Sequence, residues 1–228
     1  MQADNSMDTA KSRLLAAALA HVPFDGWSDV TLRAAVADSG MAAGLAAGLF
    51  PRGGVDMAAA YHKWGDQILR DELAQADLTA LRFREKVTHA VRLRLEMVDK
   101  EAVRRGVALF ALPQHAIEGA ALIWGTADTI WTALNDTSRD INWYTKRATL
   151  SAVYSATVLY WLGDISDNNA DTWAFLDRRI ENVMQFEKIK AGFGQNRIGQ
   201  ALSKGPLKIF QRITAPIASN DLPGRGMD

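Results

Sequence analysis

Hydrophobic positions recur at spacings of three and four residues along most of the chain, a pattern that predicts a series of amphipathic helices. The first helix covers residues 8–21, and its apolar stripe consists of Leu14, Leu15, Ala18 and Leu19. Proline and glycine between positions 23 and 26 end it. Two short helices follow: one is capped by Ser28 or Asp29 and stops at Ser39-Gly40, and the other covers residues 41–49.

Longer helices are expected over residues 55–73, 79–105, 114–134, 140–163 and 171–189. Their expected inward positions are Met57, Tyr61, Trp64 and Ile68; Leu81, Val87, Val91, Leu95 and Val98; Ile117, Ala121, Trp124, Asp128 and Trp131; and Trp173, Leu176, Ile180, Val183 and Phe186. Gly106 and Pro113 bracket a short apolar element, and residues 166–170 form a polar loop. We therefore predict an all-α fold.

The helix over residues 140–163 has two contrasting halves. Residues 148–163 carry no charge, so this half needs cover from protein or lipid, but it is shorter than the roughly 18–20 residues that cross a bilayer. In the first half, Asp140, Trp143, Tyr144 and Arg147 share one helical face. That spacing fits both a helix start whose aromatics reach the core and a partner-binding patch.

The N-terminal elements have the layout of a TetR-type DNA-binding domain: helix, glycine turn, helix, Phe-Pro and a long helix. The expected recognition helix, MAAGLAAGL, has no side chain that could bond a base edge or a phosphate. Its two glycines each weaken the helix by about 1 kcal/mol relative to alanine. Alternatively, alanine and glycine here serve close helix packing. Both interpretations predict that this helix-turn-helix does not recognise DNA.

Composition narrows the function further. The formal net charge is zero, which argues against attraction of the whole domain to nucleic acid, and the basic residues of the 82–105 stretch alternate with acids as on a solvated face. Hydrophobic residues make up 48% and charged residues 23%, as in soluble globular proteins, and there is no cysteine. The N-terminus lacks the features of a signal peptide or a mitochondrial presequence. We expect a bacterial cytoplasmic protein, or one whose presequence has been removed.

No known catalytic pattern is present. The four histidines are far apart, and His115 with Glu118 forms an i, i+3 pair that has no second copy to complete a di-iron site. The Gly192-Phe193-Gly194 sequence lacks the third glycine and the preceding strand of a dinucleotide fingerprint. Nucleophile-elbow, Walker and zinc-protease motifs are also missing. The sequence therefore predicts no catalytic residues, no metal site, no cofactor and no enzyme activity.

From Lys188 the chain is basic, with no acid before Asp221. Its apolar residues are spaced for one helical face broken at Gly205-Pro206, as in segments that lie in a membrane interface. The expected membrane-binding residues are Phe193, Ile198, Leu202, Leu207, Phe210 and Ile213. A helix docked on the protein itself, or a partly disordered tail, fits the same pattern.

Residues 136–154, DTSRDINWYTKRATLSAVY, together with ADTIW before them and DTWAFLDRRI after them, resemble the Coq-nine family of ubiquinone-biosynthesis proteins. The resemblance extends over about residues 11–189 and is densest at 127–180. It implies a TetR-like fold, a homodimer formed through the helices beginning near Asp140 and Asp171, and lipid binding rather than catalysis. It also implies that the protein assists the di-iron hydroxylase that acts on demethoxyubiquinone.

The resemblance also suggests site residues. It assigns the face of Asp140, Trp143, Tyr144 and Arg147 to docking of the hydroxylase. Asp128, which is either a partly buried acid near indole groups or a residue at the water edge, gains a structural or ligand-facing role. Apolar excess on the helices at 114–134 and 140–163 suggests a lipid pocket, whose expected wall is Ile123, Trp124, Ala127, Trp131, Tyr154, Val158 and Trp161.

These inferences predict three regions: a degenerate helix-turn-helix at 8–64, a lipid-binding and dimerisation domain at 65–189, and a membrane-associating tail at 190–228. The protein would act at the inner membrane, from the cytoplasm or, in a eukaryote, from the mitochondrial matrix. Its expected partners are an isoprenoid or quinone lipid, the hydroxylase, the membrane and a second copy of itself. It is not expected to bind DNA. The alternatives are a ligand-sensing TetR-family transcription regulator and a structural scaffold with a filled core.

Overall fold

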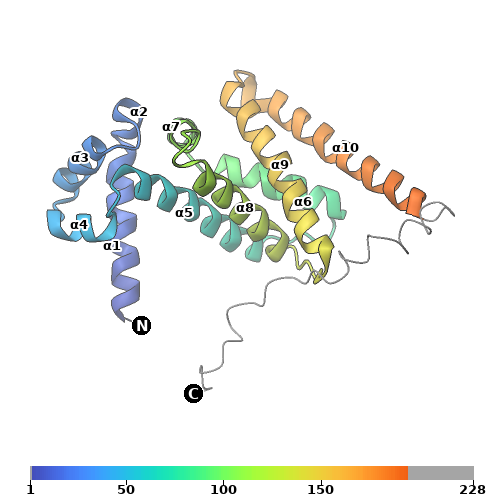
Figure 1. Ribbon diagram of the computed structural model, residues 1–228, viewed down its shortest axis with the longest axis horizontal. Helices are drawn as coiled ribbons and strands as arrows, with labels where there is room; N and C mark the ends of the chain where they lie inside the picture. Colours follow the sequence, from blue (N-terminus) through green and yellow to red (C-terminus); the bar gives the residue numbers. More distant parts are fainter. Residues whose placement is uncertain (1, 195–228) are drawn as a thin grey trace, which may run out of the picture.

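The computed structural model describes the backbone of residues 2–194, and the side-chain surroundings of residues 9–183 and of Gln185. The described residues form ten α-helices and one short 3-10 helix, with no strand among them, which confirms the all-α prediction (Figure 1). The helices are α1 (Gln2–Leu19), α2 (Val22–Asp25), α3 (Asp29–Ser39), α4 (Ala43–Leu49), α5 (Gly54–Gln75), α6 (Phe83–Glu96), α7 (Lys100–Phe110), α8 (Ala116–Ala133), α9 (Ile141–Gly163), η1 (Asp167–Asn169) and α10 (Ala170–Gly194). Within this part of the chain, no helix has both the length and the apolar character needed to cross a bilayer.

Helices α1–α4 and the start of α5 enclose a first hydrophobic core, at the left of Figure 1. Leu14 and Ala18 of α1 are fully buried there, as their spacing predicts. The Ser28 hydroxyl caps α3 by accepting the Thr31 N–H at 3.3 Å, which confirms the predicted helix start. Gly54 lies against the Trp27 carbonyl, where a Cβ atom would come within 2.3 Å of the oxygen, so only glycine allows α5 to begin here.

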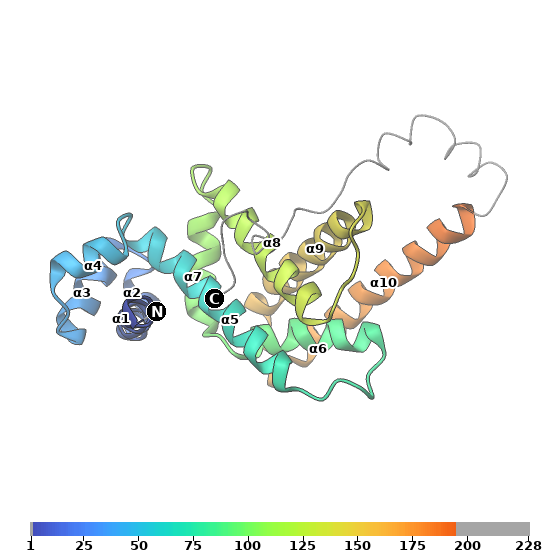
Figure 2. The same ribbon diagram turned by 90° about the horizontal axis from the view of Figure 1, so that it is seen from below.

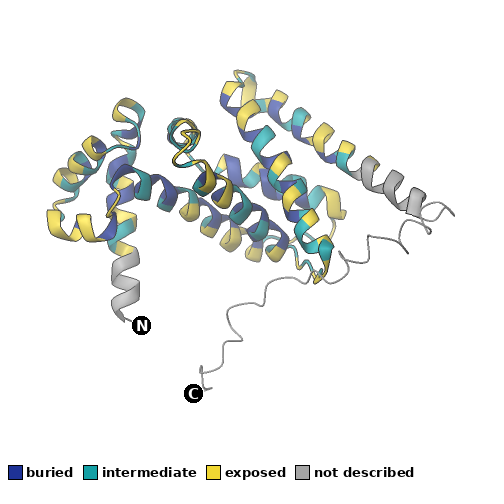
Figure 3. Cartoon of the chain, in the orientation of Figure 1, coloured by how far each residue is buried: buried dark blue, intermediate teal, exposed yellow. Residues whose placement is uncertain are grey.

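Helices α5, α6, α8, α9 and α10 enclose the second and larger core. Leu69, Val91, Ile130 and Leu176 come from four of these helices and are fully buried. Buried positions follow the inner faces of α5 and α9, whereas the outer surfaces are exposed (Figure 3). Helix α7 lies beside α2, α5 and α8 and thereby joins the two cores.

The single helix predicted over residues 79–105 is wrong, because the chain breaks after α6 and turns into α7 (Figure 2). The Asp99 carboxylate accepts the Ala102 N–H at 2.7 Å and so caps the new helix. The Asp99 N–H itself donates to the Tyr61 hydroxyl at 2.8 Å. Gly106, predicted to mark the start of a separate short apolar element, lies inside α7.

Two of the predicted helix faces also need correction. On α5 the buried positions include Met57, Tyr61, Gly65 and Leu69, each four residues apart, while Trp64 is 37% exposed. Gly65 makes room there for a long side chain from α6, as described below. On α8, Ile117 is 87% exposed and Ala121 is exposed too, because the buried face of this half of the helix runs through Gly119, Leu122 and Thr126 instead.

Candidate functional site

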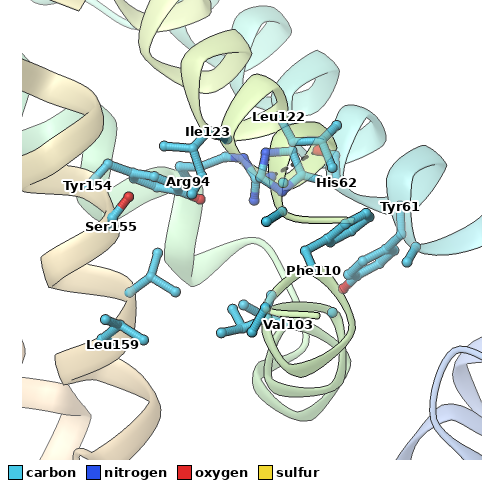
Figure 4. Close-up of a pocket in the computed structure, with 18 residues that line it drawn as sticks. Tyr61, His62, Arg94, Val103, Phe110, Leu122, Ile123, Tyr154, Ser155 and Leu159 are labelled. Atoms are coloured by element: carbon cyan, nitrogen blue, oxygen red, sulfur yellow. Dashed lines mark hydrogen bonds between the residues drawn. The ribbon is translucent and has the colours of Figure 1, made fainter. Parts of the chain in front are cut away.

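A cavity of about 370 Å³ lies among α5, α6, α7, α8 and α9, and we call it the central cavity (Figure 4). Its wall is largely apolar and includes Val103, Val107, Phe110, Leu122, Ile123 and Val158. Four other lining residues are exposed and therefore mark its mouth: Ala111, Ala116, Ala120 and Leu159. An apolar hollow with a few polar groups is the usual form of a small-molecule site.

Those polar groups include a buried ion pair between α5 and α6. The Arg94 side chain is only 2% exposed, and its Nε donates to Asp66 Oδ1 at 2.8 Å. Arg94 Nη2 donates to the His62 carbonyl at 2.9 Å. Gly65 makes this position possible, because a Cβ atom there would lie 2.6 Å from the Arg94 guanidinium carbon. The charge of Arg94 is thus neutralised inside the protein.

Thr126 of α8 extends this network towards His62. Its hydroxyl lies 2.8 Å from Asp66 Oδ1 and 2.8 Å from His62 Nε2. Since a carboxylate can only accept, Thr126 donates to Asp66 and His62 Nε2 donates to Thr126. Burial lowers the pKa of His62 to about 4, so its imidazole is neutral at pH 7. Burial also raises the pKa of Tyr154, which keeps that phenol neutral beside Arg94.

Sequence analysis missed these polar residues. The prediction that the charges of the 82–105 stretch lie on a solvated face is wrong for Arg94. Arg94 falls three residues after Val91 and seven after Val87, on the buried face of α6, so helical periodicity alone contained the signal. Asp66 likewise follows Gly65 directly on the buried side of α5.

The seven residues predicted to line a lipid pocket separate into three groups. Ile123, Tyr154 and Val158 line the central cavity. Trp131 lines a second cavity of about 240 Å³ between α6, α9 and α10. The other three, Trp124, Ala127 and Trp161, line neither cavity: Trp124 contacts the aromatic residues of α9, while Ala127 and Trp161 are buried in the core.

Trp124 of α8 joins Trp143 and Tyr144 of α9 in what we call the aromatic patch. The Trp143 ring centroid lies 6.0 Å from that of Trp124 and 4.7 Å from that of Tyr144. All three side chains are half-buried. Asp140 is exposed and caps α9, where its carboxylate accepts the Asn142 N–H at 3.0 Å. The predicted face therefore carries half-buried aromatics whose outer edges remain accessible.

Arg147, the fourth residue of that face, is buried and packs against the inner side of the aromatic patch. Its guanidinium carbon lies 3.9 Å from the Trp143 ring centroid. Its Nε donates to Asp128 at 2.6 Å and its Nη1 to Asp136 at 3.2 Å. Asp128 is therefore bonded to an arginine at the edge of the network, with 44% of its side chain exposed. Burial opposes ionisation of Asp136, but hydrogen bonds from Lys146 and Ser138 lower its pKa below the usual range.

The surface of α4 offers no polar side chains. Its exposed residues are Ala43, Gly44, Leu45, Ala47 and Gly48. Among the described residues, no group of three or more histidines and acids could hold a metal ion. Glu118, of the His115–Glu118 pair, binds Arg52 instead, at 2.8 and 2.9 Å. The predicted membrane-binding residues lie outside the described residues, except that the backbone of Phe193 belongs to α10.

Comparison with known proteins identifies relatives of this chain. The sequence model of the COQ9 family matches residues 116–187. The mitochondrial ubiquinone biosynthesis protein COQ9 of Drosophila melanogaster is 32% identical over 79% of this chain and 57% of its own length. The human protein of the same name is 30% identical over 78% of this chain and 59% of its own length. The chain thus spans less than two thirds of these relatives.

Among solved structures, the TetR transcriptional regulator of Nitrosomonas europaea matches with a TM-score of 0.62. It covers 76% of this chain and 97% of the regulator at 18% identity, a likeness of fold alone. The chain is therefore a relative of the COQ9 ubiquinone biosynthesis proteins, with a TetR-like helical fold, as its central motif predicted.

Proposed function

We propose that this protein is a lipid-binding accessory protein of ubiquinone biosynthesis, which holds an isoprenoid or quinone-type lipid in the central cavity and catalyses no reaction itself. The observation that carries the proposal is the cavity: about 370 Å³, largely apolar, with one buried polar end and an exposed mouth. The relatives of this chain are named ubiquinone biosynthesis proteins. The product of that pathway is a lipid with a polar ring, which matches a cavity of this form.

Mass spectrometry of organic extracts from the purified protein tests this function. Ala120 lines the mouth, whereas its neighbour Ala121 is exposed and lies outside the lining, so the two make a matched pair. We expect a bound lipid in the native protein and in Ala121→Trp, and a strongly reduced amount in Ala120→Trp. Extracts that contain only solvent, or equal lipid in both variants, would contradict lipid binding in the cavity.

We further propose that the aromatic patch docks the demethoxyubiquinone hydroxylase. Tryptophan and tyrosine are the residue types that dominate interface hot spots, and the patch combines them over a buried arginine. The double variant Trp143→Ala, Tyr144→Ala should lose the hydroxylase in a pull-down. Because both rings are half-buried, it should lose less stability than the roughly 3–5 kcal/mol of a core aromatic. An intact complex would contradict this assignment.

Membrane contact and dimerisation complete the proposal. The basic amphipathic segment after residue 190 would hold the protein at the inner membrane, from the cytoplasm or the mitochondrial matrix. The dimer would form through α9 and α10, where Tyr160 of α9 is 39% exposed. Analytical ultracentrifugation of the purified protein measures the dimer directly, and a monomer at micromolar concentration would contradict it.

The alternative of a transcription regulator on the same fold is not favoured. A recognition helix needs donors and acceptors that reach base edges, and the exposed face of α4 has none. We expect an operator-selection experiment at physiological salt to yield no defined site. The remaining alternative, a scaffold with a filled core, fits poorly with the central cavity.

A further inference from the structure

The buried guanidinium of Arg94 has a donor that the protein does not use. Arginine offers five N–H donors on three nitrogens. In Arg94, Nε donates to Asp66 and Nη2 donates to the His62 carbonyl, but no described residue accepts a hydrogen bond from Nη1. Among the described residues, only Arg105 Nε and Ser151 Oγ are both fully enclosed and without a hydrogen-bond partner, so Arg94 Nη1 keeps some accessible surface. Arg94 lines the central cavity. This donor therefore faces the cavity.

The surroundings of this donor carry no net charge at neutral pH. Asp66 balances Arg94, His62 is neutral, and Tyr154 keeps its proton. An anionic ligand would share Arg94 with Asp66 and so place two negative charges beside one cation in a buried site, where the cost of removing the second charge from water is not repaid. An uncharged oxygen, such as a carbonyl, needs only the free N–H and leaves the ion pair intact.

The position of Arg94 also defines which end of a ligand lies inside. Arg94 is 2% exposed, whereas Leu159 at the mouth is 62% exposed, so the donor lies at the closed end (Figure 4). Between them the wall is formed by apolar side chains such as Ile123 and Val158. A volume of about 370 Å³ is small for a ligand site, so a long tail must leave through the mouth.

We infer that Arg94 Nη1 donates a hydrogen bond to an uncharged oxygen of the lipid head group, so that the cavity takes neutral lipids head first and rejects anionic ones. Fatty acids and prenyl diphosphates belong to the rejected class, and quinones or phenols with an apolar tail to the accepted class. The inference rests on the proposed lipid binding in the central cavity and adds the residue that selects the head group.

Three probes with the same carbon chain separate these possibilities: tridecane, 2-tridecanone and tridecanoate. Binding is measured at pH 7.5 by displacement of a fluorescent lipid analogue from the full-length protein. The native protein should bind the ketone about tenfold or more tighter than the alkane, as expected for a hydrogen bond to a charged donor. The carboxylate should bind more weakly than the ketone.

The variant Arg94→Lys keeps the charge opposite Asp66 but removes the second arm of the guanidinium. It should weaken ketone binding about tenfold or more and leave alkane binding unchanged. Arg92→Lys is the matched control, since Arg92 is exposed on the same helix and should behave like the native protein. Should Arg94→Lys not fold, the double variant Arg94→Leu, Asp66→Leu replaces the pair with apolar side chains and should show the same loss of ketone preference.

A second readout is the infrared carbonyl stretch of bound 2-tridecanone, which should lie at a lower frequency in the native protein than in Arg94→Lys. Unchanged ketone affinity in the Arg94 variants, or a preference of the native protein for tridecanoate, would overturn the inference about Arg94. If the alkane still binds in that case, the proposed lipid binding remains supported. If none of the three probes binds, the proposed lipid binding fails, and the inference fails with it.

Discussion

A single methyl group added at Gly65 should disrupt the buried ion pair. The Cβ atom of an alanine there would lie 2.6 Å from the guanidinium carbon of Arg94 and 2.7 Å or less from both of its terminal nitrogens. Real Cβ contacts are never this short, so either α5 or Arg94 must move. Arg94 cannot move freely, because Asp66 and the His62 carbonyl hold two of its nitrogens.

The expected cost follows from two opposing effects. Overpacking a buried site costs about 1–3 kcal/mol, and stretching the charged hydrogen bonds adds about 1 kcal/mol or more. Against this, alanine is favoured over glycine inside a helix by about 1 kcal/mol. Gly65→Ala should therefore lower the free energy of unfolding by about 1–3 kcal/mol, equivalent to roughly 3–9 °C in Tm for a chain of this size.

Gly125→Ala provides the matched control, because Gly125 lies inside α8 and a Cβ atom there meets nothing within 4 Å. That variant should be neutral or up to about 1 kcal/mol more stable. Both are measured by urea unfolding of the full-length protein. In the background Arg94→Leu, Asp66→Leu, the cost of Gly65→Ala should shrink. Equal stability of the two alanine variants in the native background would refute the reasoning.

Three further outcomes are expected. Burial lowers the pKa of His62 to about 4, against about 6.5 in the unfolded chain. Between these pH values the unfolded state therefore binds one proton more than the folded state. The free energy of unfolding should fall by up to roughly 3 kcal/mol as the pH drops from 6.5 to 4. Urea titrations across this range should show a steeper slope in the native protein than in His62→Gln, which keeps only the contribution of carboxyl groups with a lowered pKa, such as Asp136. Arg147→Met removes one of the two cations that bind the buried Asp136, where Lys146 remains, and also removes the partner of the partly exposed Asp128. It should cost about 1.5–3 kcal/mol in chemical unfolding, the range for hydrogen bonds to charged groups, whereas a loss below about 1 kcal/mol would contradict the network. Deletion from Lys190 onward should abolish sedimentation with anionic liposomes while the dimer persists, and unchanged sedimentation would show that the segment packs on protein.

The helices could be predicted well where the sequence itself carries the signal. Ser28 and Asp140 cap α3 and α9 as their positions predict, because an N-cap depends on residues two or three positions away. The boundary at Asp99 was missed although Asp is a good cap. The charges of the 82–105 stretch run on past it at helical spacing, whereas the break is held by a hydrogen bond that the Asp99 N–H donates to the hydroxyl of the distant Tyr61.

The residues of the candidate site also differ in whether local sequence reveals them. Ile123, Tyr154 and Val158 were predictable because apolar excess on α8 and α9 is a local property of each helix. The polar end of the cavity was not predicted: periodicity places Arg94 on the buried face of α6, but Asp66, the partner that neutralises its charge, is 28 positions away on another helix. Only the packing of α5 on α6, permitted by Gly65, brings the two charges together.

We propose that the TetR-like architecture does not carry the TetR function with it, and the contacts of Arg52 support this proposal. Arg52, the basic residue closest after α4, bonds both carboxylate oxygens of Glu118, at 2.8 and 2.9 Å, and also binds Asp56. It therefore ties the start of α5 to α8 rather than extending towards a phosphate backbone. DNA binding needs several such cations free on one face, with polar side chains between them. The fold can thus be shared with regulators while the surface chemistry is not, and the function has to be argued from the cavity and the aromatic patch.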